Sequence, residues 1–408
     1  MTGSEKVVEM GDVAFLGDGP RVLSVYDGIF SGGARVLHNA VVRHLDATTA
    51  QRHTVLSLTD RSVRESTTQP ASADVGYRRL VGAGVPVTLL DRVSSQPLRP
   101  RHRAALERAV LGADVVLSLK EQPLAALARI GTAGRPVVTC LHRSDPEHQG
   151  PGLDALVSLV DQGIVTTAVC CARSTQAAYH AATGIPLDRL PVIPNGVDLH
   201  RFRPDAAVRL DVRRQLGAVD DAPVVLLSAR FDPMKDTALF ARAAATFTAT
   251  YPHAHLVLCG AGMSPTNPAL VAQLEEALGR WAGLRDQVHL LGIRADMPRL
   301  YNAADLVVLT SAYGEAAPLS LLEGMACGAV PVTTDVGDAA TMVGDARLVT
   351  SREPTEVALA WASAFEQREE HGETIVRRRQ RFSEQRTFDA YARLLDQQVD
   401  GLPLEVAV

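Results

Sequence analysis

The feature that most constrains the fold of this chain is the alternation of short apolar segments, rich in Val, Leu and Ile, with longer segments of helical period. Near-continuous apolar segments are typical of strands in a parallel sheet covered on both faces, because such strands have no solvent side. Two series of these segments occur, one from Arg21 to Pro194 and one from Pro223 to Thr350. The sequence therefore predicts an α/β protein with two Rossmann-like parallel sheets.

The strands can be placed from the apolar segments and the turn residues that bound them. In the first series we expect strands at Arg21 to Tyr26, Thr54 to Leu58, Val85 to Leu90, Asp114 to Leu119, Pro136 to Leu141, Val165 to Cys170 and Pro191 to Pro194. In the second series we expect them at Pro223 to Ala229, His255 to Gly260, Gln287 to Gly292, Asp305 to Thr310, Ala329 to Thr334 and Arg347 to Thr350. Asn195 to Ala222, with Gly196, Pro204 and a run of charges, is the predicted linker.

The carboxyl-terminal part of the chain has a different character. Beyond Ser351 it consists of charged segments of helical period, at Glu356 to Arg379 and at Glu384 to Val399. Apolar residues recur at helical spacing in the second of these segments, namely Phe388, Tyr391, Leu394 and Leu395. This pattern predicts a last helix that packs one face on a domain.

Composition excludes several classes of protein. Of 408 residues, 46% are hydrophobic and 21% are charged, which excludes a disordered, collagen-like or disulfide-stabilised chain. The formal net charge of −5 gives no reason to expect nucleic-acid binding. No long uncharged apolar run occurs, and Met1 to Pro20 resembles neither a signal peptide nor an anchor, so we expect a cytoplasmic protein. The five cysteines lack metal-ligand spacing, which predicts buried free thiols.

The densest cluster of chemically distinctive residues runs from Ser311 to Val332, out of a predicted strand and into a helix that begins near Pro318. Apolar residues leave that helix little solvent face, so Glu323 is a largely buried carboxylate that needs a partner and would suit a vicinal diol such as a ribose. Glu315 lies in the loop at the strand's carboxyl end, where open α/β sheets bind ligands. Either carboxylate alone could form a structural salt bridge, whereas both together in this sequence predict a ligand site.

A second cluster, Ser228 to Asp236, ends the first strand of the second series. Arg230 and Lys235 flank a turn that contains Pro233, which brings two cations over one crevice and suits a diphosphate. Taken singly, they would be ordinary surface cations. Only three of the 41 basic residues are lysines, however, and this supports a specific role for Lys235.

Two weaker features lie in the first series. Gly32 and Gly33 follow the first strand, where backbone can approach closely and the amides of the next helix can hold an anion, although the pair also suits a tight turn. The full Gly-x-Gly-x-x-Gly pattern is missing, which disfavours an NAD site. His142 ends another strand, either as a ligand-facing group or as a histidine satisfied by local hydrogen bonds.

Taken together, these motifs resemble those of the retaining GT-B glycosyltransferases of group one, also called family four. The resemblance covers most of the chain and is strongest from Val192 to Gly344. Gly314 to Gly328 matches the family's Glu-x₇-Glu motif, Pro194 to Asp198 matches the segment that ends the first domain, and Arg230 with Lys235 matches the phosphate-binding pair. The resemblance implies two Rossmann-like domains that face each other across a cleft, with the last helix returning to the first domain.

The resemblance also implies a role for each part of the chain. Residues 1–200 would form the acceptor-binding domain, residues 201–383 the nucleotide-sugar-binding domain, and residues 384–408 the returning helix. The implied catalytic residues are His142, Arg230, Lys235 and Glu315. The implied donor-binding residues are Gly32, Gly33, Arg230, Lys235, Ile293, Arg294, Glu315, Ala316, Ala317, Pro318, Leu319 and Glu323.

Within this set the resemblance assigns separate parts of the donor. Glu323 would hold the ribose hydroxyls and Glu315 the sugar hydroxyls, while the diphosphate would lie against the two cations and against backbone amides near Gly33, Ala316 and Ala317. Ile293 and Arg294 would lie near the base, and His142 near the sugar carbon that reacts.

The sequence departs from the family pattern at two points. Ala316 and Ala317 replace the usual Gly-Phe after the first Glu, which keeps the loop small but removes a glycine. Gly324 stands inside the helix, where it either costs about 1 kcal/mol relative to Ala or permits a close approach.

We therefore expect a retaining transferase that moves a sugar from a UDP- or GDP-sugar to a glycan, a lipid-linked or a small-metabolite acceptor. No Asp-x-Asp occurs, so we expect no metal and no cofactor, the nucleoside diphosphate sugar being the donor substrate. Two alternatives are an epimerase of the GT-B fold and a non-catalytic sugar-nucleotide binder. Arg99 to Arg103, with Leu106 and Val110, is either a basic face for peripheral contact with anionic lipid or a solvated face.

Overall fold

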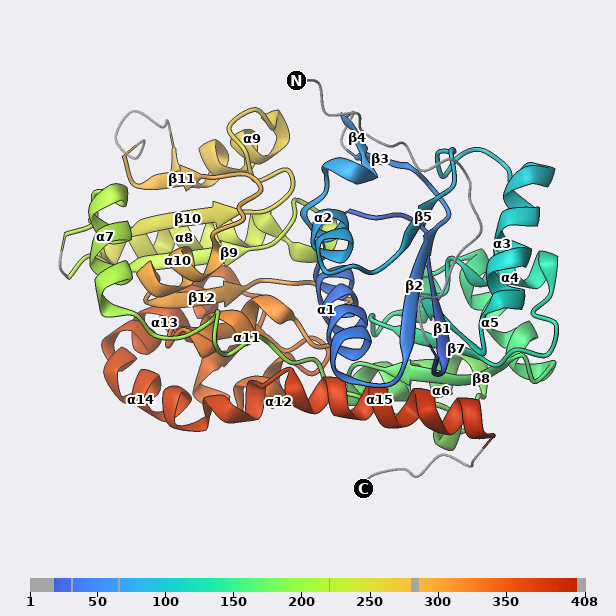
Figure 1. The fold of residues 1–408 in the computed structure, drawn as a ribbon. Coiled ribbons are helices and arrows are strands. Elements are labelled where there is room, and N and C mark those ends of the chain that lie inside the picture. The colour runs from blue at the N-terminus through green and yellow to red at the C-terminus, as the bar shows by residue number, and fades with distance from the viewer. Residues whose placement is uncertain (1–17, 31, 65–66, 220, 280–285, 402–408) are drawn as a thin grey trace, which may run out of the picture. The chain divides into compact units, whose positions relative to one another are not determined.

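The structure is a computed structural model that describes residues 18–30, 32–64, 67–219, 221–279 and 286–401 (Figure 1). The chain divides into two compact units. Unit 1 combines residues 1–194 with 386–408, and unit 2 consists of residues 195–385, so the divisions lie a few residues from the predicted boundaries at 200 and 383. Residues 1–17, which hold most of the segment examined for a signal peptide, lie outside the described residues.

Unit 1 is built on a six-stranded parallel sheet in the spatial order β5-β2-β1-β6-β7-β8. Its strands are β1 (Arg21–Tyr26), β2 (Arg52–Ser57), β5 (Val87–Leu89), β6 (Val115–Leu119), β7 (Val137–Leu141) and β8 (Val165–Cys170). Its helices are α1 (Gly33–Thr48), α2 (Val75–Gly82), α3 (Pro100–Gly112), α4 (Leu124–Ile130), α5 (Pro151–Asp161), α6 (Arg173–Thr183) and α15 (Gln385–Asp400).

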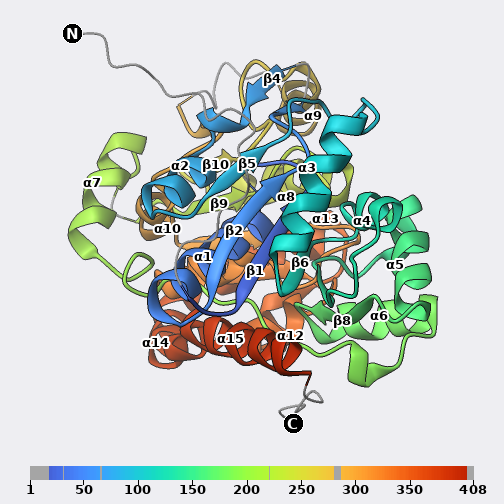
Figure 2. The ribbon, with the colours of Figure 1, turned by 45° about the vertical axis from the view of Figure 1, so that its right-hand side comes forward.

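Alternate residues of the unit 1 strands pack on opposite faces of the sheet, as the pleat requires. On one face, Val22 and Val115 contact a cluster that includes Val41 of α1 and Leu395 of α15. On the other face, the cluster is completed by α3, α4 and α5. Figure 2 shows α1 and α3 on the two sides of β1 and β2. Both faces are therefore covered, as the near-continuous apolar strands predict.

The carboxyl-terminal helix α15 belongs to unit 1, which confirms the predicted return of the chain. Four apolar residues at helical spacing are buried against the sheet, namely Phe388, Tyr391, Leu394 and Leu395. Polar contacts fix the helix further, because Gln51 Nε2 donates to Asp396 Oδ1 over 2.8 Å and the Tyr391 hydroxyl donates to Cys140 Sγ over 3.3 Å.

Three details of unit 1 differ from the sequence predictions. A two-stranded antiparallel hairpin, β3 (Arg61–Arg64) with β4 (Thr67–Pro70), was not expected. The predicted strand at Pro191 to Pro194 is only an isolated bridge between Cys170 and Val192. On α3, Leu106 and Val110 are buried in the core, so they cannot form the apolar half of a lipid-facing surface.

Unit 2 repeats the architecture with a parallel sheet in the order β11-β10-β9-β12-β13-β14. Its strands are β9 (Val224–Ser228), β10 (His255–Cys259), β11 (Val288–Leu290), β12 (Leu306–Leu309), β13 (Val330–Thr334) and β14 (Val349–Thr350). Its helices are α7 (Ala206–Leu216), α8 (Thr237–Thr250), α9 (Pro268–Leu278), α10 (Met297–Ala303), α11 (Leu319–Ala326), α12 (Ala339–Val343), α13 (Pro354–Glu366) and α14 (Arg368–Arg378).

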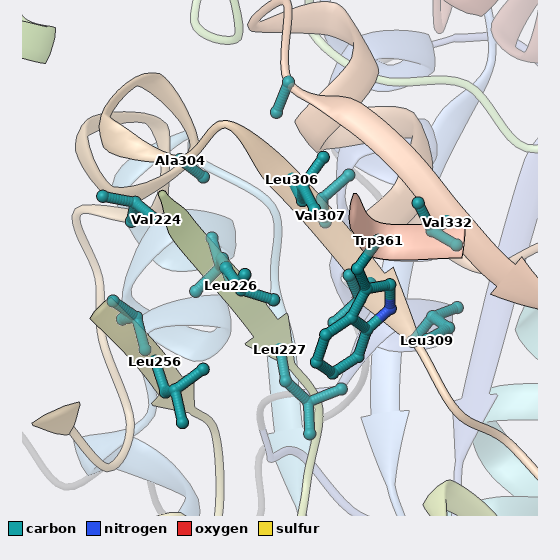
Figure 3. Close-up of a cluster of buried hydrophobic side chains, with 14 of the residues drawn as sticks. Val224, Leu226, Leu227, Leu256, Ala304, Leu306, Val307, Leu309, Val332 and Trp361 are labelled. Atoms are coloured by element: carbon teal, nitrogen blue, oxygen red, sulfur yellow. The ribbon is translucent and has the colours of Figure 1, made fainter. Parts of the chain in front are cut away.

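The core of unit 2 centres on β9 and β12 and on the indole of Trp361, which lies over these strands in Figure 3. Trp361 of α13 packs against Phe240 and Phe247 of α8, with ring centroids 5.3 and 5.8 Å apart. Among the residues that the structure describes, no helix is both long and apolar enough to cross a bilayer.

The predicted linker at Asn195 to Ala222 is wrong in its extent, because its middle forms α7 and packs in unit 2. Two arginines of α7 hold the buried carboxylate of Asp305, which precedes β12: Arg209 pairs with Oδ1, and Arg213 Nη1 lies 3.0 Å from Oδ2. Asp305 Oδ2 also accepts from the Val224 amide over 2.8 Å. The charges that made this segment look like a linker are therefore part of the fold.

Replacing Asp305 with Asn should destabilise unit 2 by about 3 to 5 kcal/mol, because two guanidinium groups lose their carboxylate partner in a buried setting. A fall of roughly 10 °C in the thermal midpoint is expected. Asp211→Asn is the matched control, since Asp211 lies on α7, the helix that carries Arg209 and Arg213, but pairs with Arg299 at the surface. Equal midpoints for the two variants would contradict the account.

In each sheet the strand order reverses beside the first strand: between β1 and β6 in unit 1, and between β9 and β12 in unit 2. Connections leave such a point in opposite directions, which opens a crevice at the carboxyl ends of the two strands. The residues that follow β9 and β12 therefore lie where open α/β sheets bind ligands.

Candidate functional site

The first side of the unit 2 site is a one-turn 3₁₀ helix, η4 (Pro233–Lys235), just after β9. Asp232 caps it, because its carboxylate accepts from the Met234 amide over 2.9 Å. The hydroxyl of Thr310, at the end of β12, donates to the carbonyls of Lys235 and Asp236 over 3.0 and 3.2 Å. The backbone of Lys235 is thus held firmly beside the loop that follows β12.

The second side is the β12–α11 loop, residues 311–318, which carries Glu315. The Lys235 ammonium forms an ion pair with Glu315 Oε1, and the Ser311 hydroxyl donates to the same oxygen over 2.6 Å. Glu315 is only 6% exposed. The structure therefore brings together a cation and a carboxylate that lie 80 residues apart in the sequence, at the reversal point of the sheet.

Arg230 lies on the same side as Lys235 but is more open. It pairs with Asp232 over 3.2 Å, and about two-fifths of its side chain is exposed. An exposed ion pair of this kind contributes little to stability, so the guanidinium can exchange its partner at low cost. Arg230 is thus available to pair with an anion from solvent.

The β12–α11 loop is supported from the neighbouring strand β13. The Thr334 hydroxyl donates to the Ser311 carbonyl over 2.7 Å, and the Asp338 amide donates to the Ala316 carbonyl over 2.9 Å. Gly337, at φ +64°, packs so closely on this loop that a Cβ atom would lie 2.1 Å from the Glu315 carbonyl oxygen. Only glycine fits there, so Gly337 fixes the position of Glu315.

Helix α11 presents Glu323 and contains the unusual Gly324. A Cβ atom on Gly324 would lie 2.6 Å from the side chain of Val307 in β12, so this glycine permits a close approach of helix to strand. Glu323 is partly buried, and burial raises its pKa to about 7, against the opposing effects of the Tyr301 hydroxyl and the Arg201 charge. The carboxylate is therefore held in a poorly solvated position near neutral pH.

The raised pKa of Glu323 predicts a pH-dependent stability. Because the folded pKa of about 7 exceeds the unfolded value of 4.5, the stabilising contribution is complete below pH 4.5 and is lost as the pH rises through 7. The free energy of unfolding of Glu323→Gln relative to that of the parent protein should therefore rise by about 2 kcal/mol from pH 5 to pH 8. Thermal midpoints of both proteins at the two pH values test this; a difference that does not change with pH would contradict it.

The other predicted donor residues of unit 2 surround these groups along the chain. Ala316 and Pro318 are buried, Ala317 and Leu319 are partly buried, and α11 begins at Leu319. Ile293 is 66% exposed, and Arg294 forms a bidentate pair with Asp296 over 2.7 and 2.8 Å. The loop after β11 thus presents an apolar side chain to solvent and a guanidinium that is already paired.

In unit 1, Gly32 and Gly33 follow β1 at the corresponding reversal point. Gly32 precedes α1, whose first residue is Gly33, and the loop between β1 and α1 is held by Arg35, which pairs with Asp27 and donates to the Gly28 carbonyl over 2.8 Å. Ser31, which precedes these two glycines, lies outside the described residues.

His142, directly after β7, is partly buried. Burial, with the nearby Lys120, His38 and Arg35, lowers the pKa of its imidazole to about 3, so the ring is neutral at physiological pH. Its Nε2 atom is buried and has no hydrogen-bond partner in the described part of the chain. Of the two interpretations of His142, the fully satisfied histidine therefore fits less well.

Two family models match the chain over most of its length. Residues 31–201 match the model described as "Glycosyltransferase Family 4", and residues 208–385 match the one described as "Glycosyl transferases group 1". The chain belongs to this glycosyltransferase family.

Relatives of this chain include two curated enzymes named D-inositol 3-phosphate glycosyltransferase. The one from Geodermatophilus obscurus is 32% identical over 259 residues, which is 61% of this chain and 55% of the relative. The one from Thermobispora bispora is 34% identical over 210 residues, 49% of this chain and 46% of the relative. The chain thus spans about half the length of the curated relatives it matches.

Solved structures agree with the GT-B fold. HepE from Anabaena, in complex with UDP and glucose, is 23% identical with a TM-score of 0.76, and the match covers 93% of this glycosyltransferase and 100% of HepE. Sucrose-phosphate synthase from Thermosynechococcus elongatus is 17% identical with a TM-score of 0.70, covering 94% and 100%. At these identities the likeness establishes the fold alone.

Several residues that position the candidate site were missed by the sequence analysis. Thr310, Thr334 and Gly337 support the loops that carry Lys235 and Glu315. Hydroxyls and glycines are frequent at strand ends, so their types carried no signal. Each of them lies at or just after the end of a strand near the reversal point, and only this position could have indicated a supporting role.

Proposed function

We propose that this glycosyltransferase transfers a sugar from a nucleoside diphosphate sugar, with UDP or GDP as the nucleotide, and retains the anomeric configuration. The observation that carries the proposal is the ion pair between Lys235 and Glu315 at the reversal point of the unit 2 sheet. Arg230 pairs with Asp232, the residue that caps the helical turn holding Lys235. The cations suit the diphosphate of a sugar nucleotide, and the carboxylate suits the hydroxyls of its sugar.

The diphosphate would lie against Lys235 and Arg230. An incoming diphosphate competes with Glu315 for the lysine, and two negative charges attract the ammonium more strongly than one. Once the lysine turns to the diphosphate, Glu315 can accept hydrogen bonds from the hydroxyls of the sugar, while Ser311 keeps its oxygen in place. Amides near Ala316 and Ala317, with Gly32 and Gly33 of unit 1, would complete the contacts to phosphate.

The nucleoside would occupy the α11 side of the site. Glu323 accepts hydrogen bonds from both ribose hydroxyls most strongly when it is ionised, so its raised pKa implies tighter nucleotide binding at pH 8 than at pH 6. Ile293 and Arg294 would border the base, the first as an apolar surface and the second through its backbone, since its guanidinium is paired with Asp296.

The chemical step we propose needs no protein nucleophile and no metal. As the bond between the anomeric carbon and the phosphate oxygen breaks, charge builds on the leaving diphosphate, and Lys235 and Arg230 stabilise it. The acceptor hydroxyl attacks from the same face and gives its proton to a phosphate oxygen. The neutral ring of His142, near the reacting carbon, would avoid repulsion with the positive charge that develops on the sugar.

The acceptor is proposed to be a hydroxylated small molecule or glycan. The names of the curated relatives favour a cyclitol phosphate among these, and lipid-linked glycans are the other class to test.

The proposal is tested by screening the purified protein against UDP-, GDP-, ADP- and dTDP-sugars. A thermal shift and nucleotide release with one donor are expected, followed by a product whose anomeric configuration, read by NMR coupling, equals that of the donor. An inverted product would refute retention. A free epimerised sugar nucleotide as sole product would identify an epimerase instead, and binding without turnover for every acceptor would identify a sugar-nucleotide binder.

A further inference from the structure

The chain passes between the two units twice, after Pro194 and after Gln385, and within unit 2 the two passages lie side by side. The Val197 amide donates to the Phe382 carbonyl over 2.7 Å, and the Glu384 amide donates to the Val197 carbonyl over 3.1 Å. We call residues 195–197 and 382–384 the crossover pair.

The crossover pair is tightly packed. A Cβ atom on Gly196 would lie 2.4 Å from Glu384 Cα and 2.7 Å from the Ser383 carbonyl oxygen. Backbone thus contacts backbone here with no side chain between, so a displacement of one passage must displace the other. The pair behaves as one element at the edge of unit 2.

Asn195 connects this element to the β12–α11 loop. Its side-chain Nδ2 donates to the Ala317 carbonyl over 2.8 Å. Since a carbonyl can only accept, the orientation of the amide is fixed, with nitrogen toward the loop. The Oδ1 atom of the same amide is buried and accepts no hydrogen bond from the residues that the structure describes. A buried acceptor without a partner is costly, so local stability alone does not explain an asparagine here.

The loop is therefore held from two directions. Thr334 and Asp338 bind the carbonyls of Ser311 and Ala316 from the β13 side, while Asn195 binds the next carbonyl, that of Ala317, from the crossover pair. Glu315 lies between these attachments. Order in the loop and order in the crossover pair are thus joined through one side-chain amide.

We propose that Asn195 is a positioning residue that couples occupancy of the donor site to the order of the crossover pair. The inference rests on the proposed function, because a ligand on Glu315 and the adjacent amides is what orders the loop. A ligand that orders the loop strengthens the Asn195–Ala317 contact, and by linkage an ordered crossover pair strengthens ligand binding.

The kinetic test uses Asn195→Ala and the isosteric Asn195→Asp, whose carboxylate cannot donate to Ala317. Both should raise the donor KM by about 3- to 10-fold, the value of one hydrogen bond, with the acceptor KM and the kcat per active molecule unchanged within about twofold. A merely structural role would lower the active fraction and the thermal midpoint without changing KM. A donor KM equal to that of the parent protein in both variants would overturn the proposal.

Hydrogen exchange on the full-length protein tests the coupling itself. The probe is whichever of UDP, GDP, ADP and dTDP raises the thermal midpoint. In the parent protein, this nucleotide should slow exchange of the Val197 and Glu384 amides several-fold. In Asn195→Ala it should slow exchange of the Asp338 amide but leave exchange of the Val197 and Glu384 amides unchanged. The matched control Thr334→Val loosens the same loop from the β13 side and should keep the response of the crossover pair.

The outcomes separate the two proposals. An unchanged response of Val197 and Glu384 in Asn195→Ala would overturn the coupling while the proposed function stands. If none of the nucleotides binds, the proposed function fails. The unliganded proteins then still decide the coupling. Thr334→Val, which loosens the loop, should accelerate exchange of both Asp338 and Val197 when Asn195 is present, but that of Asp338 alone when it is added to Asn195→Ala; equal effects on Val197 in the two backgrounds would overturn the coupling.

Discussion

Lys235→Ala is expected to lower kcat/KM for sugar transfer about a hundred- to a thousandfold. This lysine supplies charge where the leaving diphosphate becomes more negative, and removal of one such preorganised group typically has an effect of this size. Its backbone is fixed by Thr310, and only 14% of its side chain is exposed. Water therefore cannot easily take the place of the missing ammonium group. Steady-state kinetics with the donor found by screening measure the loss.

Loss of the lysine also leaves Glu315 buried without its cation, so stability must be separated from catalysis. The double variant Lys235→Ala with Glu315→Gln removes both charges and should regain thermal stability without regaining activity. Arg352→Ala is the matched control, because it removes an exposed cation paired with Asp236 directly after η4. Activity in Lys235→Ala equal to that of Arg352→Ala would refute the role of the lysine.

Gly337→Ala is expected to reduce kcat/KM about a hundredfold. The new Cβ atom would overlap the Glu315 carbonyl oxygen, so the peptide between Glu315 and Ala316 must move. A shift of about 1 Å in a positioning element can cost two orders of magnitude in rate. The same kinetic assay, together with the affinity for nucleoside diphosphate, measures the effect.

The chain offers a close control for this glycine. Gly344 has a similar positive φ of +69°, but the nearest atom to its added Cβ, the Thr341 carbonyl oxygen, lies 3.8 Å away. Both alanine variants therefore carry the same backbone strain, and only Gly337→Ala displaces Glu315. If the two variants retain similar activity, the close packing on Glu315 is not what positions the site.

Much of the fold could be predicted from the sequence, because it depends on patterns that the chain displays directly. The apolar strands, the amphipathic α15 and the loops after β9 and β12 all follow from periodicity and strand ends. The hairpin of β3 and β4 was missed because Arg61 and its neighbours lack the alternation of apolar and polar residues that marks a strand.

The errors arose where long-range contacts override local character. Asn195 to Ala222 looked like a linker because of its charges, yet Arg209 and the buried Arg213 pair with Asp305, about 90 residues away. On α3, a basic start suggested a surface face, but Leu106 is in the core. Sequence spacing does not reveal which partner a charge or an apolar side chain finds.

The candidate site shows the same division. The carboxylates and cations were recognisable because their residue types suit a sugar diphosphate, and the structure joins Lys235 to Glu315. The supporting groups were not recognisable, since the hydroxyl of Thr334, the missing Cβ of Gly337 and the amide of Asn195 act only through the geometry of the loop that they hold.

The most direct test of the central claim, that the reversal point of the unit 2 sheet binds a nucleoside diphosphate, is calorimetric titration of UDP, GDP, ADP and dTDP into the parent protein and into Lys235→Ala. We predict that at least one of them binds the parent protein with 1:1 stoichiometry. The parent protein should bind it at least about tenfold more tightly than it binds the corresponding monophosphate, and at least about tenfold more tightly than Lys235→Ala binds the same diphosphate. Equal affinity of the parent protein and the variant, or no binding of any of the four, would contradict the account.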